Sequence, residues 1–286
     1  MDVQVQISES GSQCSRCCCW YCWRRNGDEP VNSFFKSQWQ KSEWSILFLI
    51  YRWCFATWLA VTMGLSLELF FFDGKWFIYF TNWGYSLCTF VALLSAILVT
   101  VYCFTAPKTP CPRWIVKLYW HLHISAFVCA IGLSFLYWAF IYPFSNFKVP
   151  EGIHRIEIIR LYRYFFDGPD NHSCLAYFHN INSHAINSVL MIIDQVVVAF
   201  PTRIIHFVYP ALIVIAYLVF SIVYFLIGGE NVIGKPYIYR ILNWGEYPVS
   251  SALVACSGLL LVVPMCVLAF LIYKLRVWVS SSKYLS

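Results

Sequence analysis

The sequence contains few charged residues. Aspartate, glutamate, lysine and arginine make up 12% of its 286 residues, whereas a soluble globular protein carries about 25%. Hydrophobic residues make up 60% and aromatic residues 20%. A soluble protein of this composition would have too little polar surface to cover itself, so the composition indicates that lipid is the solvent.

Several other features are also missing. The first forty residues are polar and charged and lack the short apolar region of a signal peptide, so we expect an internal segment to direct insertion. The net charge of +6 is spread over tails and loops, which argues against nucleic-acid binding. The sequence contains no phosphate-binding loop, nucleotide fingerprint or metal site, and we expect neither a cofactor nor a metal.

Six apolar stretches are long enough to cross a bilayer as helices, which takes about 20 residues each. Breaker or charged residues separate them, as at 73–75 and 201–203. Because sheets or loops in lipid would leave backbone groups unpaired, we predict an all-α, polytopic transmembrane bundle. The six expected spans are 44–72, 76–104, 114–142, 176–200, 204–227 and 249–273.

The lysines and arginines outside the spans indicate the orientation. Twelve lie on the side of the two termini and seven on the other side, which predicts that both termini are cytoplasmic. The predicted organisation is a cytoplasmic tail at 1–43, a membrane domain at 44–275 and a cytoplasmic tail at 276–286. The loop at 143–175 is then outer or luminal, in the plasma membrane or the endoplasmic reticulum. Asn171 in this loop begins an Asn-x-Ser glycosylation acceptor, which agrees with that side.

Five of the thirteen cysteines gather in the N-terminal tail beside aromatic and basic residues. This setting favours S-acylation, because acyl chains, rings and cations all favour a membrane surface. The alternatives are an unmodified reduced tail and a metal held by thiolates, although the loop that usually separates two metal-binding pairs is missing. The five residues are Cys14, Cys17, Cys18, Cys19 and Cys22.

Ionisable residues at membrane depth are costly and indicate a functional or structural site. His184, Asn187, Met191 and Asp194 are spaced by three, four and three residues, which places them on one face of the fourth predicted span. Asp194 matches the depth of Arg52 in the first span. We therefore predict an ion pair between these two residues, and the simplest role of the polar face is to hold the bundle together.

Thr81 and His184 are also predicted to lie at similar depths, near the outer face of the membrane. A hydroxyl and an imidazole can form a nucleophile–base pair if their helices touch, although such residues are more often packing partners. Glu68 lies near the same face and could orient the imidazole, as a carboxylate does in a triad. Asn82 or Asn187 could donate a hydrogen bond to a developing oxyanion.

Two further histidines, His121 and His123, begin the third predicted span. They are accompanied by Trp114 and Trp120, and aromatic residues of this kind gather at membrane–water interfaces. We therefore expect both histidines at the interface opposite to Thr81 and His184.

Three short strings resemble the rolling stone family, which is named for a fly protein associated with myoblast fusion. The resemblance covers about residues 44 to 273 and leaves out the cysteine-rich tail. The strings are Tyr79-Phe80-Thr81-Asn82-Trp83-Gly84, Ser183-His184-Ala185-Ile186-Asn187-Ser188-Val189 and Tyr237-Ile238-Tyr239-Arg240-Ile241-Leu242-Asn243-Trp244.

The rolling stone family is distantly similar to the androgen-induced and androgen-dependent membrane proteins. This resemblance implies a multi-span hydrolase of branched fatty-acid esters of hydroxy fatty acids that uses an intramembrane threonine and histidine. The matching positions are Thr81 and His184, with Asp194 as the acid that closes the helical run ten residues after the histidine. Asn82-Trp83-Gly84 follows Thr81 where those proteins have a plain apolar helix, so the resemblance leaves open whether the activity is retained.

Three functions fit the sequence. The first is a membrane-embedded Thr/His hydrolase of lipid (fatty-acyl) esters, with a substrate that enters from the membrane lipids. The second is a non-catalytic plasma-membrane protein that acts in cell–cell fusion, such as myoblast fusion, or in adhesion, with partner membrane proteins bound by the loop at 143–175. A transporter is less favoured, because matching halves with Gly/Pro-interrupted spans are missing.

Overall fold

The computed structural model describes residues 31–105, 111–141 and 178–282. Within these ranges the chain is helical and forms no sheet, apart from an isolated bridge between Ser37 and Val198. Five helices in these ranges are long and apolar enough to cross a membrane, which confirms the all-α, membrane-protein fold class. The cysteines from Cys14 to Cys22, Asn171 and the loop at 143–175 lie outside the described residues.

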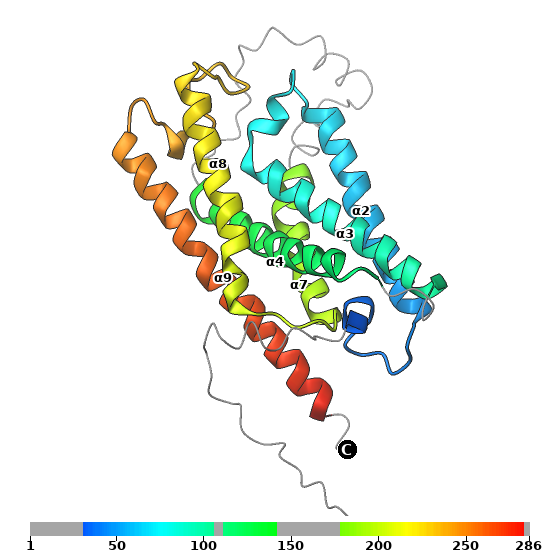
Figure 1. Ribbon diagram of the computed structural model, residues 1–286. Coiled ribbons are helices and arrows are strands. Elements are labelled where there is room, and N and C mark those ends of the chain that lie inside the picture. Colours follow the sequence, from blue (N-terminus) through cyan, green and yellow to red (C-terminus); the bar gives the residue numbers. More distant parts are fainter. Residues whose placement is uncertain (1–30, 106–110, 142–177, 283–286) are drawn as a thin grey trace, which may run out of the picture.

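The main helices run in alternate directions along the bundle, as Figure 1 shows, so residues 31–45 and the end of the last helix lie at the same end. Two helices contain π-helical stretches, at Tyr137–Ile141 after α4 and at Ile181–Ile186 before α7. A 3-10 turn, Ile204–Phe207, leads into α8. The helices are α2 Ile46–Phe70, α3 Phe80–Thr105, α4 Arg113–Leu136, α7 Asn187–Val197, α8 Val208–Leu226 and α9 Pro248–Ser282.

The fourth predicted span corresponds to the helical residues 178–197, which include α7. This segment is not among the five helices that qualify by length and composition. Six spans and cytoplasmic termini therefore stay predictions.

The helix ends follow from local chemistry. Ser45 caps α2 by accepting a hydrogen bond from the backbone N–H of Phe48, and Gly74 adopts a φ of 83° in the predicted break before α3. Gly228 has a φ of 77° just after α8, and the N–H of Gly229 bonds to the carbonyl of Tyr224 at 2.8 Å. Because glycine adopts positive φ without steric cost, these breaks lie where the sequence predicts them.

Two boundaries differ from the sequence prediction. Helix α3 begins at Phe80 and not at 76, because a 3-10 turn, Lys75–Ile78, occupies the expected first turn. Helix α9 continues through Pro264 to Ser282, beyond the expected end of its span at residue 273. The buried guanidinium of Arg276 donates hydrogen bonds to the carbonyls of Gln195 and Phe200, so the charge that suggested a tail is accommodated inside the bundle.

Residues 31–43, which the sequence placed in the tail, also contact the bundle. The ring of Phe34 stacks on Phe200 with centroids 4.9 Å apart, and the N–H of Gln38 donates to the carbonyl of Val197 at 2.8 Å. The N–H of Ala199 donates to the carbonyl of Lys36 at 3.1 Å. This segment therefore holds the C-terminal end of α7.

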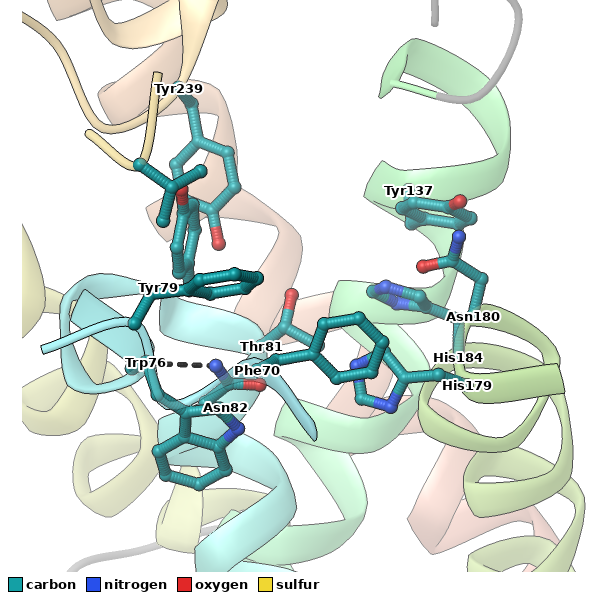
Figure 2. Close-up of a pocket in the computed structure, with 12 residues that line it drawn as sticks. Phe70, Trp76, Tyr79, Thr81, Asn82, Tyr137, His179, Asn180, His184 and Tyr239 are labelled. Carbon is teal, nitrogen blue, oxygen red and sulfur yellow. Dashed lines mark hydrogen bonds between the residues drawn. The ribbon is translucent and has the colours of Figure 1, made fainter. Parts of the chain in front are cut away.

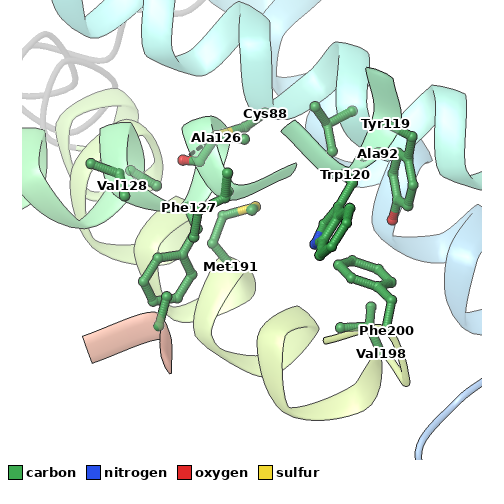
Figure 3. Close-up of a cluster of buried hydrophobic side chains, with 14 of the residues drawn as sticks. Cys88, Ala92, Tyr119, Trp120, Ala126, Phe127, Val128, Met191, Val198 and Phe200 are labelled. Carbon is green, nitrogen blue, oxygen red and sulfur yellow. Dashed lines mark hydrogen bonds between the residues drawn. The ribbon is translucent and has the colours of Figure 1, made fainter. Parts of the chain in front are cut away.

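Small residues allow α3 and α4 to pack closely. Cys88, Ala92 and Ala96 of α3 and Ala126 of α4 are fully buried, and Figure 3 shows three of them beside Phe127 and Met191 at the centre of the core. Lipid chains are as apolar as leucine, so helices in a membrane gain from close van der Waals packing, which small residues permit.

Replacing Gly84 with Val is expected to destabilise the bundle by about 1–3 kcal/mol, the usual cost of overpacking. A Cβ at Gly84 would lie 2.6 Å from Cδ1 of Leu133 and 3.4 Å from Cβ of Cys129, so the two further methyl groups of valine would force Leu133 to repack or α3 and α4 to move apart. The measurement is the melting temperature of the detergent-solubilised protein. Gly64→Val is the matched control, because nothing lies within 4 Å of a Cβ there. Equal melting temperatures for the two variants would contradict the prediction.

Candidate functional site

A buried ion pair joins α2 and α7. The Nη1 atom of Arg52 lies 2.6 Å from Oδ1 of Asp194, and both side chains are buried. The hydroxyl of Tyr51 donates to the same carboxylate oxygen at 2.9 Å. The matched depths predicted this pair, which satisfies a charge on each helix in a region where an unpaired charge would be costly.

The expected interfacial position of His123 is wrong. His123 of α4 is buried, and its Nε2 lies 2.8 Å from Oδ2 of Asp194, so the acid ties together α2, α4 and α7. His121 is half-buried and stacks on Tyr209 at 3.8 Å between ring centroids. The two histidines point differently because residues two apart on a helix face different sides.

A cavity of about 360 Å³ lies at the other end of α7. It lies roughly 15 Å from the ion pair, because ten residues separate His184 from Asp194 along the helix. The walls combine rings with hydroxyl, amide and imidazole groups, and Figure 2 shows how they face one another. The lining residues are Phe70, Phe72, Trp76, Tyr79, Thr81, Asn82, Tyr137, His179, Asn180, His184, Val232 and Tyr239.

Thr81 lies in the first turn of α3 on one wall of the cavity. The Tyr239 side chain contacts the Thr81 side chain and the backbone of Phe80 and Thr81. Burial raises the pKa of Tyr239, and burial raises the pKa of Tyr79 to about 12. Both phenols are therefore neutral near pH 7, and each is able to donate a hydrogen bond.

His184 lies on the opposite wall, within the π-helical stretch before α7. Its ring stacks on Tyr137 with centroids 3.7 Å apart and an interplanar angle of 4°, which fixes the plane of the imidazole. The Nδ1 atom of His184 is buried and has no hydrogen-bond partner. Figure 2 shows Thr81 and His184 facing the same space without a hydrogen bond between them. Both side chains therefore line the same cavity.

The supporting polar residues divide into two groups. Asn82 lines the cavity, and its Nδ2 donates to the carbonyl of Trp76 at 2.7 Å. Asn187 does not line the cavity, and its Nδ2 lies 3.7 Å from Sγ of Cys88. Glu68 is exposed and is not a lining residue, so the structure does not place it where it could orient His184. Of the two asparagines that the sequence singled out as oxyanion donors, Asn82 is therefore the one that lines the cavity.

No carboxylate lines this cavity, and in the described ranges no group of three or more His, Cys, Asp or Glu is arranged to hold a metal ion. Of the lining residues, sequence reasoning predicted Thr81, Asn82 and His184 as site residues and missed the others, among them Tyr137, His179 and Tyr239. Tyr239 was within a string already singled out, whereas Tyr137 carried no signal because it is one aromatic residue among many in an apolar span.

A family model described as "Protein rolling stone" matches residues 21–283. The chain belongs to the rolling stone family. It is 34% identical to "Protein rolling stone" of Drosophila melanogaster over 261 residues, which cover 86% of this chain and 84% of the relative. No solved structure matches the chain.

In this member of the rolling stone family, all three strings that carry the resemblance meet at the cavity. The first string contributes Tyr79, Thr81 and Asn82, the second contributes His184, and the third contributes Tyr239. These strings are far apart in the sequence and come from α3, from the helix that contains α7, and from the segment between α8 and α9. The rolling stone features therefore converge on one site.

Proposed function

We propose that this rolling stone family member is a membrane-embedded hydrolase of lipid (fatty-acyl) esters, with Thr81 as nucleophile and His184 as general base. The convergence of Thr81, His184, Asn82 and Tyr239 on one cavity of about 360 Å³ carries the proposal. A hydroxyl, an imidazole and neutral hydrogen-bond donors are the groups that acyl transfer requires.

The first half-reaction transfers the acyl group to the protein. The ester carbonyl lies between the two walls, and Oγ of Thr81 attacks its carbon while His184 accepts the hydroxyl proton. Asn82 and Tyr239 donate hydrogen bonds to the oxyanion. The C–O bond to the alcohol then breaks, the proton on His184 passes to the alkoxide, and the acyl group stays on Thr81.

Water completes the second half-reaction. His184 accepts a proton from the water, which attacks the acyl carbonyl, and returns that proton to Oγ of Thr81 as the fatty acid leaves. The sum is one ester and one water converted to one acid and one alcohol. The Thr81–His184 hydrogen bond forms only with substrate present, as is common where catalytic bonds are long in the ligand-free state.

The site chemistry supports a neutral imidazole. Among the described residues that line the pocket there is no carboxylate that would stabilise a protonated ring, and the stacked Tyr137 restricts rotation of the ring. Nδ1 of His184 is buried and accepts no hydrogen bond, so no partner in the protein competes for the proton that the ring is proposed to accept. The substrate approaches through lipid, because the helices that hold the cavity present apolar side chains on their outer surfaces.

The test uses the full-length protein in phosphatidylcholine nanodiscs, supplied with a long-chain acyl ester of a hydroxy fatty acid. We expect release of the fatty acid and, after rapid acid quench, an acyl group on the peptide that contains Thr81, detected by mass spectrometry. Glu68→Gln is the control and should behave as wild type, because Glu68 is exposed outside the cavity. No hydrolysis, or an acyl group on another residue, would refute the proposal.

The alternative function, in cell–cell fusion or adhesion, would be carried by the loop at 143–175, which lies outside the described residues. The two functions separate in a cell-fusion assay. If the protein acts through its loop, Thr81→Ala supports fusion as wild type does, whereas exchange of the loop for a neutral linker abolishes it.

A further inference from the structure

Two smaller cavities lie beside the cavity of about 360 Å³ that contains Thr81 and His184, here called the catalytic cavity, on the side of the apolar part of the bundle. The first has a volume of about 90 Å³ and shares Thr81, Tyr137 and Tyr239 with the catalytic cavity. The second has a volume of about 30 Å³ and shares Leu136 and Gly258, among others, with the first. Because each cavity shares wall residues with the next, the three cavities lie in a series that starts at Thr81.

The character of the walls changes along this series. Beyond Tyr239 the walls are formed by hydrocarbon and thioether side chains, such as Leu136, Val214, Leu261 and Met265. Apolar cavities stay dry and accept apolar ligands. Along α9 the series runs from Val254 to Met265, which is about 16 Å at the helical rise per residue. Its length and dryness suit a hydrocarbon chain.

Two glycines create the space. Gly258 of α9 lines both smaller cavities, and a Cβ built there meets nothing within 4 Å. Gly132 of α4 lines the inner cavity, and its nearest neighbours would be Met265 at 3.9 Å and Leu261 at 4.0 Å. The inner cavity, at about 30 Å³, suits the end of a single chain better than a fused ring system such as a sterol.

We propose that these two cavities form an acyl channel, which holds one unbranched acyl chain of a lipid ester whose carbonyl lies at Thr81. The inference rests on the proposed hydrolase function and specifies its substrate as a long-chain acyl ester. The occupant follows from the polar mouth at Thr81 and the apolar walls behind it. Helices α8 and α9 lie beside one another (Figure 1), and both expose apolar side chains, such as Leu212 and Leu260. The chain is drawn from the surrounding lipid.

The decisive variant is Gly258→Phe, because the new ring would enter the channel without meeting a neighbour at its Cβ. Gly64→Phe is the matched control, since Gly64 is exposed on α2 and equally free of neighbours. Both proteins, in nanodiscs, are given a stearoyl ester and a butyryl ester of the same alcohol. We expect Gly258→Phe to lower stearoyl turnover by about 10-fold or more, as pocket-filling changes do, and to leave butyryl turnover at the wild-type level.

A second measurement, photolabelling, tests binding of the acyl chain in the channel independently of ester hydrolysis. A photoreactive stearic acid analogue should label α9 between Val254 and Met265 in wild type, and Gly258→Phe should lose this label while Gly64→Phe keeps it. Hydrolysis in wild type with unchanged stearoyl turnover and unchanged labelling in Gly258→Phe would overturn the channel alone. Absence of hydrolysis with labelling of α9 would overturn the hydrolase and keep the channel as a lipid-binding site. If Gly258→Phe does not fold, Val214→Phe fills the same passage and decides the question by the same results.

Discussion

Thr81→Ala and His184→Ala are each expected to lower the rate of ester hydrolysis by roughly 10²–10⁴-fold, the usual contribution of a catalytic proton transfer. Thr81→Ala removes the attacking hydroxyl, and His184→Ala removes the imidazole whose Nδ1 has no other partner. The measurement is the kcat/KM for a long-chain acyl ester with purified protein in nanodiscs. Because Tyr239 contacts the Thr81 side chain and the His184 ring stacks on Tyr137, the melting temperature of each variant in detergent is measured alongside its kcat/KM.

Two further variants distinguish a catalytic role of Thr81 and His184 from a purely structural one. Thr81→Ser keeps the hydroxyl and should retain hydrolysis, and the double variant with both alanines should be no slower than the slower single one. This non-additivity is expected where two residues act in one step. Multiplicative losses, or wild-type hydrolysis in a folded alanine variant, would show that the pair is not catalytic.

Asp194→Asn is expected to destabilise the protein by about 3–5 kcal/mol, because breaking a buried ion pair leaves an uncompensated charge. The guanidinium of Arg52 would lose the charged carboxylate 2.6 Å away, and either Tyr51 or His123 would face an amide NH₂ group in place of the oxygen that it now contacts. The measurement is the free energy of unfolding in mixed micelles with increasing SDS. Because the acid contacts three helices, the loss should affect the whole bundle.

The double variant Arg52→Met/Asp194→Leu is the matched control. Replacing a buried ion pair with apolar side chains of similar volume is often neutral, so this variant should be more stable than Asp194→Asn. If Asp194→Asn unfolds at the same SDS fraction as wild type, the ion pair contributes no stability to the bundle.

The helices were predictable because hydropathy and breaker residues act locally. Gly74 and Gly228 end helices through their own backbone conformation, and no distant contact is needed to find them. Other ends depend on tertiary contacts. Arg276 looked like part of a polar tail, and only the carbonyls of Gln195 and Phe200, more than seventy residues away, accommodate it within the bundle.

The sequence predicted the depth of the site residues along their helices, but not the side of each helix on which they lie. Counting residues along each span placed Arg52 level with Asp194, and the ion pair is present. The same counting placed Glu68 near His184, but Glu68 points outward from α2, because depth carries no information about which side of a helix faces the bundle. The π-helical stretch around His184 was also beyond prediction, since a spacing of three and four residues describes only an α-helix.

The contacts of residues 31–40 with the end of α7 connect this N-terminal segment, through the helix, to the cavity. The bridge from Ser37 to Val198 and the stacking of Phe34 on Phe200 hold the chain at the C-terminal end of α7. The opposite end of the same helical segment, in the π-helical stretch before α7, contains His184. A displacement of residues 31–40 would therefore be transmitted to the imidazole along α7.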